Sequence, residues 1–459
     1  MNSDRIPAPA EGVEALASWL RAEGVDLVIL SFVDNAGIVR VKSVPVHRLP
    51  AAARYGVGAS PCFEAFRFDD TMVVGRHLGG PDGDLRLVPD LRRLVRLAAQ
   101  PGWAWSPVDK FTQDGERFVA CQRTFAAAQV AAAAQRGLRF RMAFETEWVL
   151  GESGDEQEFV PAFSGPAYGI LRLEAVADYA RELVAALQAQ GLSVEQFHPE
   201  YALAQLELSV SPNDPVGAAD DVLLVRHTIR RLSSAHGWRA SFAPSVVPGG
   251  AGSGAHLHVS MHDEDGNTFA GGSGPFRLQE VGESFLAGVL RELPALMAVG
   301  AGNPASFLRL QPSHWAGVWQ CWGHETREAA VRFVSGTTDT GNWAANAEIK
   351  CFDATANPYL LVGAVIAAGL AGVSERLSLP EPITGDPAGW TAQQRERAGV
   401  RRLPTSGVEA VDALAASRVL AEAMGEVLHD TVLTVRRAEA EAFASSSPEE
   451  LAASTRWRW

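Results

Sequence analysis

The sequence has few cysteines and an excess of acidic over basic residues. Its four cysteines lie far apart without CxxC spacing, which predicts small buried side chains in a reducing, cytoplasmic setting: Cys62, Cys121, Cys321 and Cys351. Forty lysines and arginines face 54 aspartates and glutamates, a net charge of −14. This balance argues against a non-specific nucleic-acid or anionic-membrane binder.

Signals for export and membrane insertion are also missing. The start, Met1-Asn2-Ser3-Asp4-Arg5, has no apolar region, so no signal peptide is expected. Residues 354–374 are apolar and uncharged, but they contain Asn357, Pro358 and several glycines. This composition is typical of a loop that leads into a buried helix, and no membrane span is predicted.

What is present is a globular composition, 47% hydrophobic and 20% charged over 459 residues. Residues 12–108 predict a small α+β module. Pro101, Pro107 and Asp114-Gly115 mark the passage to a larger second domain, residues 109–459, whose last third is mostly helical. The predicted class is therefore α+β, with a Pro- and Gly-rich surface loop at 380–405.

Hydrophobic periodicity predicts the individual elements. Helices are expected at 12–24, 126–136, 171–190, 218–235, 277–299, 359–379, 408–417 and 418–444. Strands are expected at 25–32, 38–44, 85–88, 138–150, 203–210, 256–262, 329–334 and 347–352, with further short strands within 61–74.

Several strands of the second domain share a polar face of unusual composition. Side chains alternate along a strand, and the polar positions here are mainly Glu, His and Ser rather than the Lys, Thr and Arg of a solvated sheet. Carboxylates and imidazole in apolar strands need a counter-charge, which two Mg²⁺ or Mn²⁺ ions would supply. The candidate ligands are Glu145, Glu147, Glu200, Glu207, His256 and Glu348.

Two further features support a nucleotide-dependent enzyme. Gly252-Ser253-Gly254 precedes His256 and would let the backbone approach a ligand closely. Three arginines follow in the sequence: Arg309, Arg327 and Arg332. Guanidinium groups near two metal ions can stabilise the charge of a phosphoryl group during its transfer.

These motifs resemble the glutamine synthetase family in order and separation. The quoted segments are Glu145-Thr146-Glu147, Glu200 to Glu207, Gly252 to His258 and Asn357-Pro358-Tyr359. The resemblance covers nearly the whole chain. It implies an N-terminal β-grasp domain and a catalytic domain with a curved antiparallel sheet and surrounding helices.

The resemblance also implies roles for the residues. Glu147, Glu200 and Glu207 would hold one metal, and Glu145, His256 and Glu348 the other. His258, Ser260 and Arg332 would line the ATP site, with Arg327 and Arg332 contacting the transferred phosphoryl group. Arg309 and Gly252 would bind the carboxylate substrate, glutamate in the family. ATP would activate its γ-carboxylate as an acyl phosphate, which an amine then attacks.

Departures from the family pattern bear on the substrates. The acidic Asp-Gly-Ser stretch of the ammonium site corresponds to Gly58-Ala59-Ser60, and the flap glutamate corresponds to Trp315. Family arginines correspond to Asn346 and to Lys350, a candidate substrate contact. Since ammonium needs an anionic pocket, ammonia is expected to be a poor substrate.

An aromatic lid at Trp315 suits an organic amine, such as a polyamine, ethanolamine, alkylamine or arylamine. A polyamine calls for acidic residues at the entrance, and the sequence identifies none. Trp319 and Trp322 are core or lid residues. Because Ala251 stands where the family has an asparagine, the carboxylic acid substrate could also be an acid other than glutamate.

The leading interpretation is an ATP-dependent carboxylate–amine ligase that forms a γ-glutamyl amide. The alternatives are a glutamine synthetase proper that uses ammonia, a phosphagen-kinase-like phosphotransferase, and a non-catalytic binding homologue. By resemblance we expect a cytoplasmic homo-oligomer, a dodecamer of two hexameric rings, with no nucleic-acid or membrane partner.

Overall fold

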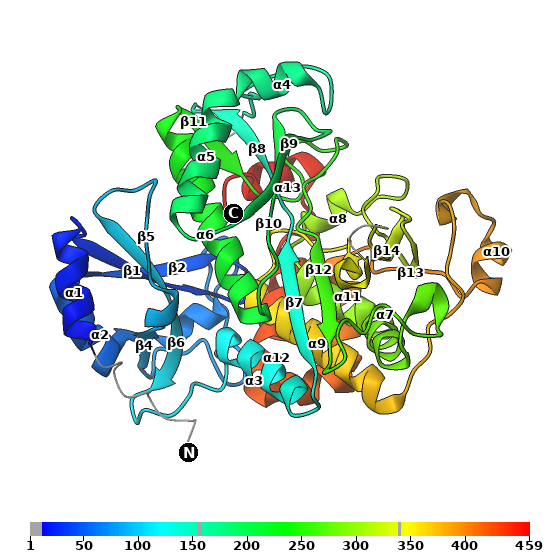
Figure 1. Cartoon of the computed structure of the whole chain (residues 1–459), viewed down its shortest axis with the longest axis horizontal. Coiled ribbons are helices and arrows are strands. Elements are labelled where there is room, and N and C mark those ends of the chain that lie inside the picture. The colour runs from blue at the N-terminus through cyan, green and yellow to red at the C-terminus, as the bar shows by residue number, and fades with distance from the viewer. Residues whose placement is uncertain (1–11, 155–157, 338–340) are drawn as a thin grey trace.

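The computed structural model describes residues 12–154, 158–337 and 341–459. The segment Met1–Arg5, on which the signal-peptide expectation rests, lies outside these residues. Within them the chain forms three β-sheets and a group of packed helices, with the N-terminal sheet at the left of Figure 1 and helices α9 and α12 toward the bottom.

The N-terminal sheet has the strand order β2-β1-β6-β4-β3, with β5 paired to β6. Its strands are β1 (Leu27–Val33), β2 (Val39–Pro45), β3 (Val57–Ala59), β4 (Leu85–Pro89), β5 (Val95–Arg96) and β6 (Trp103–Thr112). Helices α1 (Val13–Ala22) and α2 (Leu49–Tyr55) bury Leu20 and Leu49 against it. β6 runs through the expected division at 108/109, which stays a prediction.

The predicted strands within 61–74 are wrong. Pro61–Ala65 forms a 3₁₀ turn instead. Ser60 starts this turn, because its hydroxyl accepts a hydrogen bond from the amide of Cys62 at 3.2 Å. Only an isolated bridge between Phe66 and Met72 follows in this described segment.

Two further sheets form the frame of the second domain. One has the order β11-β8-β10-β9 and is antiparallel: β8 (Thr146–Glu152), β9 (Val194–Pro199), β10 (Gln205–Val210) and β11 (Trp238–Ser241). The other has the order β16-β13-β14-β15-β12-β7, with one parallel pair, β13–β14: β7 (Arg139–Phe144), β12 (Leu257–His262), β13 (Trp319–His324), β14 (Ala329–Val334), β15 (Asn346–Ile349) and β16 (Arg401–Arg402).

The single strand predicted at 138–150 is wrong, because the chain changes sheets at Glu145. β7 pairs with β12 in the six-stranded sheet, and β8 pairs with β10 in the four-stranded sheet. The amide of Glu145 donates to the carbonyl of His256 at 3.0 Å, which fixes the crossing point. The helix predicted at 171–190 is likewise two helices, α4 (Ile170–Ala175) and α5 (Ala177–Ala189), separated by non-helical Val176 (φ −118°).

Helices with buried apolar side chains form the core beside the six-stranded sheet of the second domain. The main ones are α3 (Gln122–Ala134), α6 (Pro215–Ala235), α7 (Glu280–Gly300), α9 (Pro358–Glu375), α11 (Gly407–Ala416) and α12 (Arg418–Ala442). α9 is long and apolar enough to span a membrane, but 78% of it is buried in the fold. A Cβ on Gly288 of α7 would lie 2.4 Å from the carbonyl oxygen of Ala368 in α9, so the two helices touch directly.

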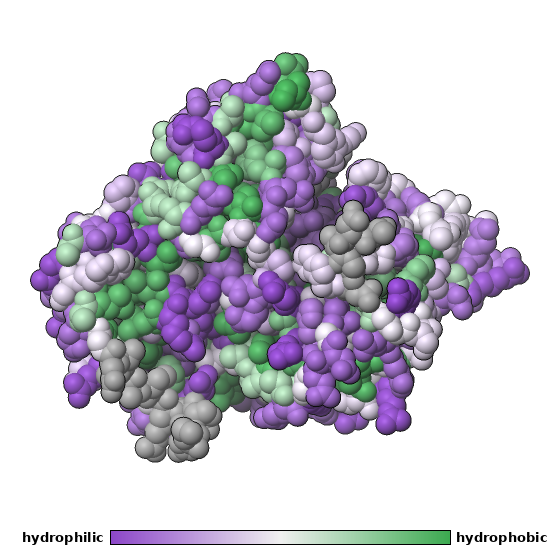
Figure 2. All heavy atoms as spheres, viewed as in Figure 1, coloured by the Kyte–Doolittle hydropathy of each residue, from purple (hydrophilic) through white to green (hydrophobic). Residues whose placement is uncertain are grey.

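Short helices complete the chain. α8 (Ser306–Arg309) leads into the loop before β13, α10 (Ala392–Arg397) lies in the Pro- and Gly-rich segment, and α13 (Pro448–Thr455) lies near the C-terminus. Figure 2 shows polar and apolar side chains interspersed over the face that it draws.

Candidate active site

Acidic and histidine side chains converge where the two sheets of the second domain meet. Glu147 and Glu207 come from β8 and β10, and Glu200 follows β9. His256 precedes β12, whereas Glu348 lies in β15. All of these except Glu200 are buried: Glu147, Glu207, His256 and Glu348. The crossing of the chain at Glu145 therefore brings together residues that the sequence spreads over about two hundred positions.

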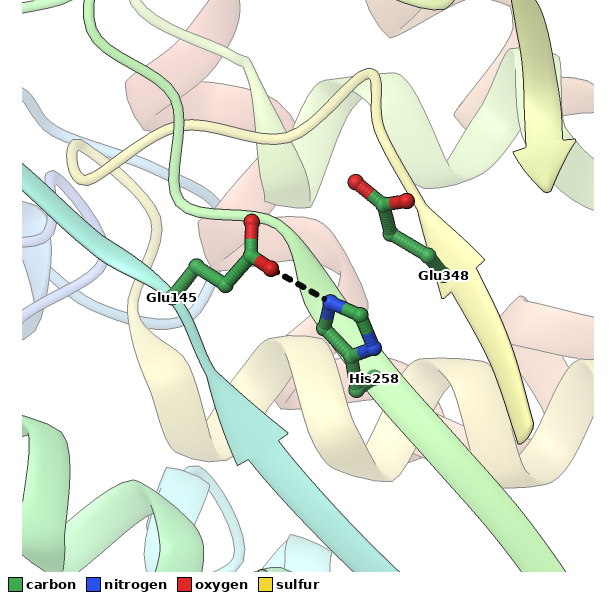
Figure 3. Close-up of side chains that lie close together, drawn as sticks. All are labelled: Glu145, His258 and Glu348. Carbon is green, nitrogen blue, oxygen red and sulfur yellow. Dashed lines mark hydrogen bonds and ion pairs between the residues drawn. The ribbon is translucent and has the colours of Figure 1, made fainter. Parts of the chain in front are cut away.

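One group consists of Glu145, His258 and Glu348, whose ligand atoms all lie within 4.8 Å of one another. Figure 3 shows them pointing into a common space from the end of β7, from β12 and from β15. His258 Nε2 lies 2.9 Å from Glu145 Oε1. His256 also belongs here, because its Nδ1 lies 2.9 Å from Glu145 Oε2 and 3.0 Å from Glu348 Oε1.

The electrostatics of this group favour ionised carboxylates. Burial acts to raise the pKa of Glu145, but hydrogen bonds from His256 and His258 hold it below its usual range. Burial also acts to raise the pKa of Glu348, but the hydrogen bond from His256 helps to hold it well below its usual range. Burial acts to lower the pKa of His258, yet the Glu145 carboxylate raises it to about 9.

A second group consists of His198, Glu200 and Glu207. His198 Nε2 lies 3.4 Å from Glu207 Oε1, and its Nδ1 lies 3.6 Å from Glu200 Oε1. Burial raises the pKa of Glu207 to about 7, and burial likewise raises the pKa of Glu200. The hydrogen bond to Glu207 is the main cause that raises the pKa of His198 to about 9. Because the pKa values of these two carboxyl groups are raised, a bound cation would stabilise their ionised form.

The sequence-based ligand set did not include His198. His198 is the register partner of Glu207 across β9 and β10. The segment His198-Pro199-Glu200 was visible, but only the strand pairing shows that this imidazole faces Glu207. Glu147, assigned from the sequence to the same metal, instead accepts hydrogen bonds at Oε2 from the Gly254 amide (3.0 Å) and Gln205 Nε2 (2.9 Å).

The glycine loop before β12 packs directly on Arg309. A Cβ on Gly254 would lie 2.6 Å from His256 Nε2 and 2.8 Å from Arg309 Nη2, so any larger residue would displace these side chains. Arg309 is 6% exposed, and its Nη2 donates to the carbonyl of Lys350 at 2.9 Å. Its Nη1 is buried and has no hydrogen-bond partner among the described residues. An anionic ligand would supply one.

Two cations flank the buried Glu348. Arg332 Nη1 lies 2.9 Å from Glu348 Oε2, and Lys350 Nζ lies 2.9 Å from Glu348 Oε1. Ser260 lies two residues after His258 on β12 and contacts His262 at 3.0 Å. The structure thus brings Arg309, Arg332 and Lys350 together with the acidic groups, while the predicted role of Ser260 in the ATP site stays a prediction.

Trp315 and Arg327 lie together at the side of this cluster. Trp315 is 57% exposed, in contrast to buried Trp319 and Trp322. Arg327 is exposed, and its guanidinium carbon lies 5.8 Å from the centre of a Trp315 ring. Trp319 and Trp322 are therefore core residues. The lid role of Trp315 and the phosphoryl contact of Arg327 stay predictions.

Comparison with known proteins agrees with this architecture. Residues 12–117 match the glutamine synthetase N-terminal domain, and residues 119–453 match the glutamine synthetase catalytic domain. The chain belongs to the glutamine synthetase family. It is an ATP-dependent ligase of that family, whose members use ATP and divalent metals. The donor set of two carboxylate–imidazole groups fits such metals chemically.

Individual relatives cover nearly the whole chain. Gamma-glutamylpolyamine synthetase GlnA3 of Streptomyces coelicolor is 52% identical and aligns over 99% of this chain and 98% of its own. Glutamine synthetase of Halobacterium salinarum is 28% identical over 96% of each chain. A solved glutamine synthase homolog superposes with a TM-score of 0.83 at 32% identity, covering 93% of this chain and 97% of that one. A GmaS/ADP complex gives a TM-score of 0.81 at 25% identity, covering 94% and 97%.

Proposed function

We propose that this protein joins the γ-carboxylate of glutamate to an organic amine at the expense of ATP, and that the amine is a polyamine. The reaction proceeds through a γ-glutamyl phosphate, from which the amine displaces phosphate to form a γ-glutamyl amide. The 52% identity to a gamma-glutamylpolyamine synthetase over nearly the full length supports this choice of amine. Glutamine synthetase proper and a non-catalytic homologue are the competing readings.

The convergence of two carboxylate–imidazole groups beside buried Arg309 and half-buried Arg332 is the observation that carries the proposal. Glu145, His256 and Glu348 would hold one ion with His258 beside them. Glu147, Glu200 and Glu207 would hold the other, with His198 as a further donor. Bound Mg²⁺ or Mn²⁺ would offset charge on the phosphate oxygens.

The cationic side chains have separate tasks. The partnerless Nη1 of Arg309 is suited to a substrate carboxylate, and the backbone at Gly252 lies against the same side chain. Arg332, which pairs with Glu348, would contact a transferred phosphoryl group. Lys350 holds the other oxygen of Glu348 and so positions that ligand.

The test is a turnover assay with Mg²⁺ or Mn²⁺, ATP, glutamate and a panel of amines that includes ammonia. Phosphate release and product mass are measured. Phosphate released only with glutamate plus an organic amine supports the ligase. Turnover with ammonia alone indicates glutamine synthetase, a phosphorylated amine indicates a kinase, and no turnover indicates a binding protein. Glu348→Gln should be inactive, while exposed Glu325→Gln should retain full activity.

We infer from family membership that the protein is a cytoplasmic homododecamer of two hexameric rings with a domain division at 108/109. Light scattering during size-exclusion chromatography should give the mass of twelve chains. A monomer or dimer that remains active would contradict the assembly.

A further inference from the structure

The loop that carries Trp315 is anchored on two acidic residues. It follows Arg309 directly and spans residues 310–318, between α8 and β13. The amide of Trp315 donates to Glu328 Oε1 at 2.9 Å, and the hydroxyl of Ser313 donates to Asp386 Oδ2 at 2.7 Å. Ser313 and Trp315 have positive φ angles of 60° and 55°, so these contacts hold an unfavourable backbone. Two carboxylates therefore hold the loop that carries the exposed indole.

One carboxylate oxygen of Glu328 accepts a hydrogen bond, and the other has no partner among the described residues. The residue is 6% exposed, and its Oε2 is buried with no hydrogen-bond partner among the described residues. Burial raises the pKa of Glu328, and nearby Asp386 raises it further, while Lys350 and His314 lower it. A buried carboxylate oxygen without a donor destabilises the fold. An ammonium group would satisfy it.

Glu328 also lies next to the strand that carries Arg332. It is a bend residue that immediately precedes β14. Arg332 contacts Glu348, and the amide of Lys350 donates to the carbonyl of Ala330 at 3.0 Å. Lys350 is close enough that its charge acts to lower the pKa of Glu328. Glu328 therefore lies near the group of charged side chains around Glu348.

We propose that Glu328 binds the non-reacting ammonium group of a di- or polyamine substrate and so determines amine specificity. This assignment rests on the proposed function. Asp386 adds negative charge behind it, and the Trp315 indole covers the methylene chain, with the loop shifting to admit the amine. The ring already accepts a cation, the guanidinium of Arg327, at 5.8 Å. The acidic entrance that a polyamine requires, and that the sequence pattern did not identify, is provided by these two residues.

The decisive variant is Glu328→Gln, which keeps an oxygen acceptor for the Trp315 amide and removes the charge. 1,4-Diaminobutane and butylamine share a carbon chain and differ in the second amine. We expect the KM for 1,4-diaminobutane to rise about 10- to 100-fold. The KM for glutamate and the kinetics with butylamine should change less than about twofold, since neither uses the charge. An unchanged diamine KM, or an equal rise for both amines, overturns the proposal.

Two companion variants separate charge from loop anchoring. Glu328→Asp keeps the charge and should retain the preference for the diamine; behaviour identical to Glu328→Gln overturns the proposal. Ser313→Ala removes the bond to Asp386 without changing charge and should affect both amines alike; a selective loss of the diamine would overturn the role of Glu328. Absence of turnover with every amine refutes the proposed function itself, whereas wild-type turnover without a diamine preference refutes only this inference.

Discussion

Two glycines of the loop before β12 should respond differently to the same added methyl group. A Cβ on Gly254 would meet only the ends of two side chains, His256 Nε2 at 2.6 Å and Arg309 Nη2 at 2.8 Å. A Cβ on Gly252 would meet a backbone atom, the carbonyl oxygen of Pro244, at 2.3 Å, and also the Arg309 side chain at 2.6 Å. Side-chain ends can move aside, but backbone cannot without a change in the fold.

The magnitudes follow from these distances. Ordinary contact begins near 3.4 Å, so Gly254→Ala displaces the His256 ring by about 0.8 Å. A misplacement of about 1 Å in a catalytic site can cost roughly 100-fold in rate, or about 2.7 kcal/mol of transition-state stabilisation. Gly252→Ala should lose similar activity and in addition about 1–3 kcal/mol of folding stability, because overpacking strains the backbone.

The assay pairs kcat/KM for ATP-dependent phosphate release with thermal unfolding of each variant. Gly254→Ala should unfold within about 2 °C of wild type, whereas Gly252→Ala should unfold several degrees lower. Gly389→Ala is the matched control, since its Cβ would have nothing within 4 Å, and it should leave both quantities unchanged. Wild-type kcat/KM in Gly254→Ala, or an equal loss of stability in both loop variants, would refute the assignment of this loop to the active site.

Further changes test the site and the core. Burial lowers the pKa of His227 to about 4 from 6.5, so the unfolded chain binds more protons between these values and stability is lost as pH falls from 6.5 to 4. Between pH 7 and pH 4.5 the free energy of unfolding of His227→Gln should fall by about 2–3 kcal/mol less than that of the wild type, as measured by denaturant unfolding. An equal fall in both proteins would contradict this reasoning. Mn²⁺ at 100 times its Kd should stabilise the wild type by about 2.7 kcal/mol, and Glu145→Gln should lose most of this gain in a thermal shift measurement; equal gains would place the metal elsewhere. Gly288→Val should destabilise the α7–α9 contact by about 3 kcal/mol or more, and a wild-type midpoint in urea would mean that the helices separate easily. Trp315→Glu should shift the amine preference toward ammonia, and an unchanged amine profile would remove the lid role.

Strand alternation and residue type were sufficient to identify the carboxylate and imidazole side chains that the fold brings together. The polar faces of Gln205–Glu207–Ser209 and His256–His258–Ser260 could be read from the sequence, because side chains on a strand alternate whatever the strand pairs with. Most helices of the C-terminal third were also predicted near their observed bounds, since long apolar helices such as 358–375 carry a strong local signal.

Errors arose where a local pattern continued across a change of partner. Residues 138–150 alternate as one strand, yet β7 and β8 belong to different sheets, and the crossing falls on Glu145. Nothing in the local pattern marks that point, because it is fixed by pairing with β12 and β10. Pro61 and Ser60 turned an expected strand into a 3₁₀ turn, a signal that was readable but outweighed by the apolar residues around it.

The sequence by itself determined the family and named candidate ligands, because both depend on which residue types stand at which spacing; that Trp315 replaces a flap acid stays a prediction. Only the tertiary structure decided that His198 faces Glu207, that the side chains of Glu145 and His258 meet, and that Glu328 accepts from the Trp315 amide while its other oxygen has no partner among the described residues. Each of these is a contact between separate strands or loops. Such contacts are set by sheet register and chain crossing, which residue spacing along one segment does not specify.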